Sequence, residues 1–307
     1  KNLTSLLNVA IEHKASDIHI RTNEVPCLRI QGDLIPIQTK SFSPEDVDDI
    51  IKILLSNKAM AQLNDKSEID GAFGIEDLCR LRFNIFRYFG QFGIVLRIIN
   101  TQVPNLASLG VSKVLANIAL APRGMILVTG ATGSGKSTTL AAMINHINEN
   151  RSSHIISIED PIEYLHTQKK SRISQREIGH DTEDFSSGLR SALRQDPDVI
   201  SIGEMRDSLT TEIALKAAET GHVLFSTLHT TNSITTIGRI ISMFSPHEQP
   251  EVRKRFAENL YAIIGQRLLI GKNGQTVIAN ETEPAGGAGP HGPAAGRRCR
   301  SLERENR

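Results

Sequence analysis

The sequence predicts an α/β protein with two domains: a small mixed α+β domain, then a larger domain with a mostly parallel sheet. A chain of 307 residues is long enough for about two domains that each bury a core. Short strand-like segments with hairpin signals fill the first part of the chain. In the second part, short apolar runs alternate with helical segments, which indicates parallel strands covered by helices on both faces.

The first elements follow directly from the residue pattern. Apolar residues from Leu3 to Ile11 recur at helical spacing, so the chain opens with an amphipathic helix. Asp17 to Arg21 alternates polar and apolar side chains, which is typical of a strand. The dipeptide Gly32-Asp33 is a hairpin signal between the apolar segments Leu28–Gln31 and Leu34–Ile37.

A second helix is expected to begin after Ser43. Ser43 is suited to the N-cap, Pro44 to the first turn, and the acidic pair Glu45-Asp46 to a capping box. The apolar residues between Val47 and Leu55 then lie on one helical face. Further strands complete a small α+β domain at residues 1–99, and they are expected at Ile69–Phe73, Leu78–Phe86 and Phe92–Ile98.

The second domain is expected at residues 111–280, after a linker at 100–110 that carries Pro104 and has little periodicity. A short helix begins near Val111, and strands then alternate with helices. The strands of this domain are expected at Met125–Thr129, Ile155–Ile158, Val199–Ile202 and Val223–Thr227.

The end of the chain has a different composition. Residues 281–307 are rich in Gly, Pro, Ala and Arg, and Leu302 is their only large apolar residue. Such a segment cannot offset the entropy of ordering its backbone, so we expect a disordered tail.

Composition excludes several classes of function. A formal net charge of +1 creates no broad field for nucleic acid or anionic lipid. No apolar run is long enough to span a membrane. The three cysteines are far apart, without a C-x-x-C pair, so a thiolate zinc site is not expected. An odd and sparse cysteine count fits a reducing cytoplasm.

The most informative motif is a phosphate-binding loop of the pattern G-x-x-x-x-G-K-[ST]. It lies between the apolar strand Met125–Thr129 and a segment of helix formers from Thr138, as phosphate binding requires. Lys136 would neutralise the β- and γ-phosphates, and the Ser137 hydroxyl would bind Mg²⁺. The residues expected to hold the nucleotide, ATP, are Gly130, Ala131, Thr132, Gly133, Ser134, Gly135, Lys136, Ser137 and Thr138.

Polar residues follow the other apolar strands. Glu204 ends the strand that begins at Val199, where it would lie beside the loop and hold Mg²⁺ directly or through water. The segment Glu159–Glu163 contains three carboxylates that suit water activation, although a solvated acidic turn has the same pattern. His222 and His229 flank another strand, and His229 is the stronger candidate for contact with the γ-phosphate, the alternative being an ordinary polar residue.

These motifs, in this order, resemble the secretion-type ATPases of bacterial pili and secretion systems. Within that superfamily they are most similar to the PilT-type pilus-retraction motors of twitching motility. Taken together the signatures are highly specific, and a further short motif near the N-terminus matches as well. The matching segments are Ala15–His19, Gly130–Ser137, Ile158–Glu163, Asp196–Asp207 and Glu219–Thr231.

The resemblance implies a PAS-like N-terminal domain on a RecA-like P-loop ATPase core. It implies a homo-hexamer in which ATP lies between the two domains and an adjacent subunit supplies arginines. By the same resemblance Glu163 orients the attacking water and Glu204 is the acid on the Mg²⁺ side. The arginines at the family's positions are Arg80, Arg82 and Arg97.

The function implied is ATP hydrolysis that powers type IV pilus retraction. The expected location is the cytoplasm at the inner-membrane face, with an inner-membrane pilus platform protein as the partner and no nucleic acid. Alternatives are a type IV secretion ATPase, a nucleic-acid motor and a nucleotide-binding protein of low turnover. The family's C-terminal helical subdomain is expected to be absent, because the tail at 281–307 replaces it.

Overall fold

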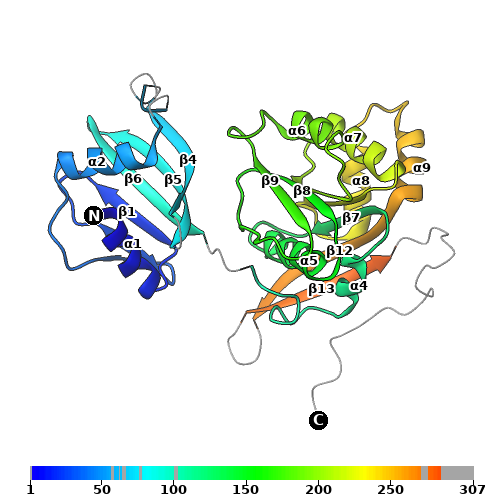
Figure 1. Ribbon diagram of the computed structural model, residues 1–307, viewed down its shortest axis with the longest axis horizontal. Helices are drawn as coiled ribbons and strands as arrows, with labels where there is room; N and C mark the ends of the chain where they lie inside the picture. Colours follow the sequence, from blue (N-terminus) through cyan, green and yellow to red (C-terminus); the bar gives the residue numbers. More distant parts are fainter. Residues whose placement is uncertain are drawn as a thin grey trace, which may run out of the picture. The chain divides into compact units, whose positions relative to one another are not determined.

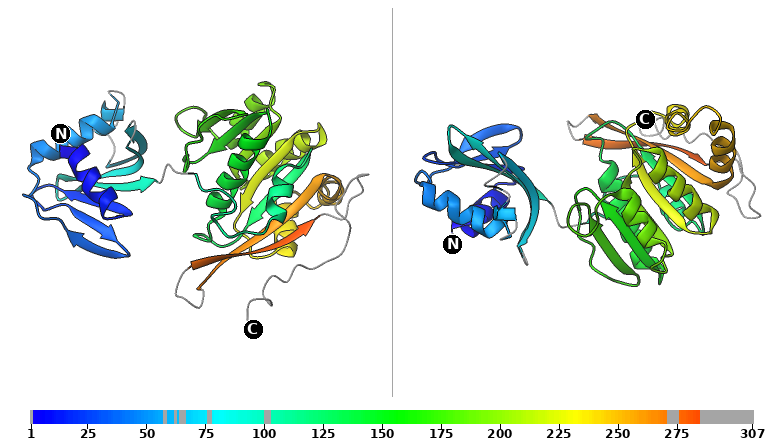
Figure 2. Two further views of the ribbon diagram at one scale, coloured as in Figure 1. Left: turned by 60° about the horizontal axis from the view of Figure 1, so that its bottom comes forward. Right: turned by 90° about the horizontal axis from the view of Figure 1, so that it is seen from above.

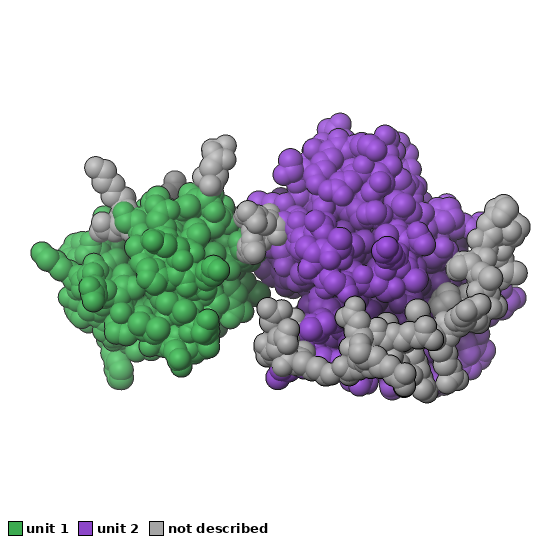
Figure 3. Space-filling model, turned by 90° about the horizontal axis from the view of Figure 1, so that it is seen from below, with its two compact units in different colours: residues 1–101 green, residues 102–307 purple. Residues whose placement is uncertain are grey.

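The computed structural model describes residues 2–56, 59–61, 63, 67–75, 78–99, 103–270 and 276–284. The chain forms two compact units, unit 1 at Lys1–Thr101 and unit 2 at Gln102–Arg307 (Figure 3). The boundary between them falls within the segment that the sequence predicts to be a linker. None of the described helices is long and apolar enough to cross a membrane.

Unit 1 is a six-stranded antiparallel sheet in the order β3-β2-β1-β6-β5-β4, with α1 and α2 packed on it (Figure 1). The two helices and one face of the sheet bury a common apolar core that includes Leu7, Ile51, Leu81 and Ile94. The elements are α1 (Asn2–Glu12), β1 (Asp17–Arg21), β2 (Cys27–Ile30), β3 (Asp33–Pro36), α2 (Pro44–Leu54), β4 (Glu68–Ile75), β5 (Cys79–Tyr88) and β6 (Gln91–Ile99).

The capping box predicted at the start of α2 is confirmed. The Ser43 side chain accepts a hydrogen bond from the Asp46 N–H, and the Asp46 carboxylate accepts one from the Ser43 N–H. The predicted hairpin turn, in contrast, is wrong by one residue. Ile30 pairs with Asp33, so the turn is Gln31-Gly32, with left-handed φ angles of 51° and 98°. A two-residue turn of this kind needs positive φ at both positions, and glycine meets that need at the second.

Unit 2 contains a seven-stranded sheet in the order β13-β12-β7-β11-β10-β8-β9. The strands from β12 to β9 pair in parallel, and β13 joins antiparallel at one edge. The elements are α4 (Val114–Ala119), β7 (Gly124–Thr129), α5 (Lys136–Asn150), β8 (His154–Glu159), β9 (Arg172–Glu177), α6 (Phe185–Ala192), β10 (Val199–Glu204), α7 (Ser208–Glu219), β11 (Val223–Leu228), α8 (Ser233–Ile241), α9 (Gln249–Asn259), β12 (Leu260–Ile270) and β13 (Thr276–Pro284).

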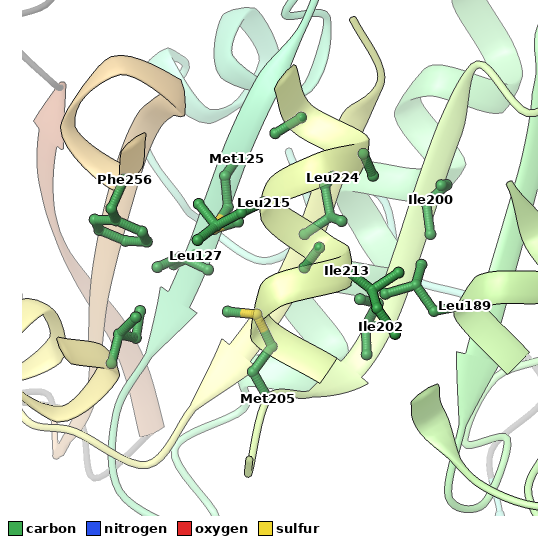
Figure 4. Close-up of a cluster of buried hydrophobic side chains, with 14 of the residues drawn as sticks. Met125, Leu127, Leu189, Ile200, Ile202, Met205, Ile213, Leu215, Leu224 and Phe256 are labelled. Carbon is green, nitrogen blue, oxygen red and sulfur yellow. The ribbon is translucent and has the colours of Figure 1, made fainter. Parts of the chain in front are cut away.

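Helices cover both faces of the unit 2 sheet (Figure 2). Successive side chains of a strand point to opposite faces, so β7 contributes to two cores. Met125 and Leu127 pack with α6, α7, α8 and α9 (Figure 4), whereas Ile126 and Val128 pack with α4 and α5. All four side chains are fully buried. The predicted fold class, with a small α+β domain and a mostly parallel sheet, is confirmed.

Several predicted boundaries require correction. Leu106 lies in the predicted linker 100–110, yet it is buried in the core of unit 2 beneath α4 and α5. The predicted disordered tail begins at 281, yet β13 continues through Pro284 because Glu281 pairs with Gly265 on β12. The rest of the predicted tail, 285–307, lies outside the described residues, as do 100–102. Three strands were not predicted, namely β9, β12 and β13.

Candidate nucleotide-binding site

The phosphate loop joins the buried strand β7 to helix α5. Gly133 and Gly135 have φ angles of 78° and 82°, a left-handed conformation that glycine adopts without strain. Gly130 faces a different constraint, because a Cβ there would lie 2.4 Å from the carbonyl oxygen of Gln266 on β12. The N-cap residue of α5 is Gly135, which has no side chain to satisfy the first helical N–H groups. The start of α5 is therefore suited to an anion.

The Lys136 side chain lies folded inside the loop. Its ammonium donates hydrogen bonds to the carbonyl oxygens of Gly130 and Ala131, at 3.0 and 2.9 Å. Burial lowers the pKa of Lys136, and the carboxylates of Glu204 and Glu163 oppose that shift. The loop thus holds a buried cation near two acidic residues, one at the end of β10 and one in the segment after β8.

His229 lies between the lysine of the loop and the acidic residue at the end of β10. The Lys136 ammonium lies 3.5 Å from His229 Nδ1. An ammonium only donates, so Nδ1 accepts and the neutral imidazole carries its proton on Nε2. That nitrogen lies 3.5 Å from Glu204 Oε2, and the other oxygen of Glu204 contacts Arg206. Glu204 is thus held between two cationic or proton-donating groups, with its side chain only 16% exposed.

These side chains surround one cavity of about 480 Å³. The phosphate loop lines one side of it. The carboxyl ends of β8, β10 and β11 line the other side, as expected for a parallel sheet. Gly130, Ala131 and Ser134 do not line it; Gly130 and Ser134 are buried, whereas Ala131 is exposed and only its carbonyl contacts Lys136. The sequence-predicted residues that line it are Thr132, Gly133, Gly135, Lys136, Ser137, Thr138, Glu163, Glu204 and His229.

The cavity wall fits a magnesium ion bound together with phosphate. The Ser137 hydroxyl and the Glu204 carboxylate both line it, and oxygen ligands of this type suit Mg²⁺. Within the described ranges no cluster of three or more His, Cys, Asp or Glu side chains could hold a metal by itself. The protein alone therefore offers a partial ligand set, which is typical of Mg²⁺ sites completed by substrate phosphates.

The carboxylates of the Glu159–Glu163 segment have different environments. Glu163 is exposed at the cavity, whereas Glu159 lies at the end of β8 and accepts hydrogen bonds from Ser157 Oγ at 2.6 Å and Gln175 Nε2 at 3.1 Å. Desolvation raises the pKa of Glu159, and these hydrogen bonds oppose the shift. The structure thus excludes a solvated acidic turn at Glu159, which is a half-buried residue of the cavity wall with two hydrogen-bond donors.

Replacing Glu159 with glutamine is expected to stabilise the nucleotide-free protein at pH 8. The pKa of Glu159 is raised on folding, so the folded state holds its proton more tightly than the unfolded chain. The free energy of unfolding therefore falls as the pH rises above the pKa that Glu159 has in the unfolded chain. Thermal unfolding at pH 5 and pH 8 should show a higher Tm for Glu159→Gln at pH 8 and a smaller difference at pH 5. An equal change in Tm at both pH values would contradict this linkage.

Sequence reasoning missed Gln266, which supports the loop from β12. Gln266 is 1% exposed, donates to the Ser134 carbonyl at 2.6 Å and accepts from Thr139 Oγ1 at 2.8 Å. Asn280 Nδ2 of β13 also donates to the same side-chain oxygen, Gln266 Oε1, at 3.1 Å. The sequence did contain a signal for this residue, a lone glutamine in the apolar run Leu260–Ile270. A buried amide needs hydrogen-bond partners, so a glutamine in such a run indicates a polar contact.

The sequence reasoning also gave no role to Tyr164 and His166. Both line the cavity, and the Tyr164 hydroxyl lies 3.0 Å from Thr138 Oγ1. Burial lowers the pKa of His166 to about 4, so its imidazole is neutral at physiological pH. The acidic segment therefore reaches the nucleotide loop through a tyrosine as well as through Glu163.

The predicted arginines lie in unit 1, whereas the cavity lies in unit 2. Arg82 on β5 stands directly opposite Arg97 on β6, and Arg97 in turn stands opposite Asp17 on β1. The buried Asp17 carboxylate accepts a hydrogen bond from Arg97 Nε at 2.8 Å. Arg80 stands opposite Ile99 on the same sheet.

Comparison with known proteins gives consistent results. The family described as type II/IV secretion system protein matches residues 1–304. The type IV pilus retraction ATPase PilT of Pseudomonas aeruginosa is 41% identical over 280 residues, which are 91% of this chain and 81% of PilT. A twitching motility protein of Neisseria gonorrhoeae is 44% identical over 255 residues, 83% of this chain and 68% of that protein.

Solved structures share the fold. A pilus retraction motor PilT with bound ADP superimposes with a TM-score of 0.88 at 43% identity, covering 92% of this chain and 83% of that one. The ATPase DotB of Legionella pneumophila gives a TM-score of 0.81 at 30% identity, covering 92% and 80% of the two chains. With its phosphate loop and this likeness along nearly its whole length, the chain belongs to the type II/IV secretion system protein family.

Proposed function

We propose that this protein is an ATPase that powers the retraction of type IV pili. The observation that carries the proposal is the single cavity in which the phosphate loop and Lys136 face Glu163, Glu204 and His229. The likeness to PilT proteins, described as pilus retraction ATPases, supports the same reading.

Each group at the cavity has a role in this reaction. Lys136 exchanges its contacts with the loop carbonyls for phosphate oxygens, and the glycine loop supplies N–H donors. Ser137 and Glu204 hold Mg²⁺, which neutralises charge on the phosphates when it is bound. Glu163 orients the attacking water, and His229, which lines the same cavity, contacts the γ-phosphate.

The proposed assembly is a homo-hexamer at the cytoplasmic face of the inner membrane. ATP binds at the cavity of unit 2, and Arg80, Arg82 and Arg97 of a neighbouring subunit stabilise charge at the γ-phosphate. An inner-membrane pilus platform protein is the proposed partner, so contact with the membrane is indirect. The solved PilT and DotB structures support a shared architecture for this class of ATPase.

A second candidate function is a type IV secretion ATPase. The description of the matching family, type II/IV secretion system protein, includes this class, but the 41–43% identity to PilT proteins favours pilus retraction. A nucleic-acid motor is disfavoured because the net charge of +1 provides no field for a polyanion.

The proposed function can be tested in the organism that carries the gene. Purified protein should release phosphate from Mg·ATP at a rate that DNA and RNA leave unchanged. Deletion of the gene should leave cells with extended surface pili and without twitching, and a plasmid copy should restore both. Normal twitching with a loss of protein export would instead support the secretion ATPase, and stimulation by nucleic acid would contradict both.

Glu204→Ala and Glu163→Gln are expected to act differently on the metal. If Glu204 serves Mg²⁺, its loss should raise the Mg²⁺ concentration needed for half-maximal turnover by about 10–150-fold, since the loss of a charged ligand interaction costs about 1.5–3 kcal/mol. Glu163→Gln should bind ATP and Mg²⁺ as the wild type does, yet turn over slowly. Titration of Mg²⁺ at saturating ATP separates the two, with Glu258→Ala on the exposed face of α9 as the control. Superimposable titrations for the wild type and Glu204→Ala would refute this division of roles.

A further inference from the structure

Strand β9 lies at the edge of the unit 2 sheet, beside the acidic segment that carries Glu163. β9 pairs in parallel with β8, so Gln175 stands opposite Ser157 and Glu177 opposite Glu159. Neither Gln175 nor Glu177 lines the nucleotide cavity. Both nevertheless bind the backbone of the segment that follows β8.

The Gln175 amide is fixed by three hydrogen bonds. Its Nε2 donates to the Tyr164 carbonyl at 2.8 Å and to Glu159 Oε1 at 3.1 Å. Its Oε1 accepts from the His166 N–H at 2.9 Å. Both the oxygen and the nitrogen of the amide are thus hydrogen-bonded. A flipped amide would place its NH₂ against an N–H and its oxygen against a carbonyl, and neither pair forms a hydrogen bond. Gln175 therefore joins the acidic segment to β8 in one defined arrangement.

Glu177 binds the same segment on the other side of Glu163. It is 4% exposed, and its Oε2 accepts from the Ile162 N–H at 3.0 Å. Its own N–H donates to the Asp181 carboxylate at 2.8 Å, which ties β9 to the turn that follows it. Breaking the hydrogen bonds of a buried carboxylate costs free energy, so Glu177 holds the Ile162 backbone in place.

Glu163 therefore lies between two tethered residues. Its predecessor, Ile162, is held by Glu177, and its successor, Tyr164, is held by Gln175. Glu163 itself is exposed at the cavity, where packing alone would leave its position poorly defined. An error of about 1 Å in the placement of a reacting group can cost about 10²-fold in rate.

We propose that Gln175 and Glu177 are positioning residues for ATP hydrolysis, because they hold the backbone on both sides of Glu163 and so set its carboxylate at the nucleotide. The inference rests on the proposed function and adds two residues that act through Glu163 without touching the substrate.

The test removes each tether and keeps the size of the side chain. Gln175→Met and Glu177→Leu should each lower kcat for phosphate release by about 10–100-fold. The Kd for ATP should stay within about twofold of the wild type, because a positioning group acts on the chemical step. Glu177→Gln keeps an oxygen for the Ile162 N–H and should recover most of the lost kcat. Ser174→Ala is the matched control, since Ser174 lies on the same strand and contacts His154 instead.

A double-mutant cycle with Glu163→Gln distinguishes positioning from general damage. In the Glu163→Gln background, Gln175→Met should lower kcat little further, because the group that it positions is already lost. Additive losses, or a fall in ATP affinity parallel to the fall in kcat, would overturn the inference. Should Gln175→Met fail to fold, the Glu177→Leu and Glu177→Gln pair decides alone.

The two proposals fail in different ways. A Glu163→Gln variant that hydrolyses ATP at the wild-type rate would remove the role proposed for Glu163. A slow Glu163→Gln variant beside wild-type rates in Gln175→Met and Glu177→Leu would overturn the positioning role alone.

Discussion

Lys136→Ala is expected to lower steady-state phosphate release by about 10³-fold or more, because the variant lacks a preorganised charge at the phosphates. In the nucleotide-free protein the ammonium already occupies the loop, bound to the carbonyls of Gly130 and Ala131. Its desolvation cost is therefore met before the nucleotide arrives, and binding exchanges two carbonyl contacts for charged phosphate oxygens. ATP affinity should fall as well, since this charge acts in the ground state and in the transition state.

The measurement is phosphate release at saturating Mg·ATP, together with ATP affinity by isothermal titration. Lys254→Ala is the matched control, because it also removes an ammonium, and Lys254 on α9 forms an exposed ion pair with Glu258. That variant should behave as the wild type. Turnover by Lys136→Ala at the wild-type rate would refute the assignment of this segment as a phosphate-binding loop.

The parts of the fold that the sequence predicted are those with local signals. The phosphate loop is such a case, because its glycines, its lysine and the flanking strand and helix are contiguous from Gly124 to Asn150. The capping box of α2 is another, since Ser43 and Asp46 bind each other within one turn. Apolar runs likewise revealed the central strands β7, β8, β10 and β11.

Two of the missed strands, β9 and β13, lack a local pattern. β9 reads Arg-Ile-Ser-Gln-Arg-Glu, with one apolar residue, because an edge strand is paired on one side and its polar side chains bind the neighbouring segment. β13 ends in Asn-Glu-Thr-Glu-Pro, whose composition predicts disorder, yet it is ordered by its pairing with β12. Such pairing depends on the partner strand and not on the residues of the strand itself, so periodicity does not report it.

The same reason limits prediction of the site. Glu204 and His229 could be proposed singly from strand ends, but their link through Nε2 of the imidazole depends on the order of β10 and β11 in the sheet. Gln266 meets the loop from more than 130 positions away in the sequence, as the bond to Ser134 shows. The residues that carry the chemistry were therefore more accessible to sequence reasoning than the residues that position them.

Arg82→Ala is expected to lower ATP turnover by about 10³-fold, the effect of losing a fully engaged arginine at the γ-phosphate of a neighbouring subunit. The structure argues that this loss is not a folding defect. Arg82 stands directly opposite Arg97 on the exposed face of the sheet, and like charges in that arrangement destabilise a sheet. The alanine variant should thus unfold at a Tm no lower than that of the wild type.

Mixing Arg82→Ala with Lys136→Ala distinguishes a shared site from a local effect. An active interface needs an intact Lys136 on one subunit and an intact Arg82 on the next, and random 1:1 mixing in a ring creates it at about a quarter of the interfaces. Phosphate release should therefore rise well above that of either variant alone, with light scattering used to confirm that rings form. A third sample, Lys136→Ala mixed with the double variant, offers no intact lysine and should stay inactive. Recovery in that sample, or none in the first at any ratio, would contradict an arginine supplied by the neighbouring subunit.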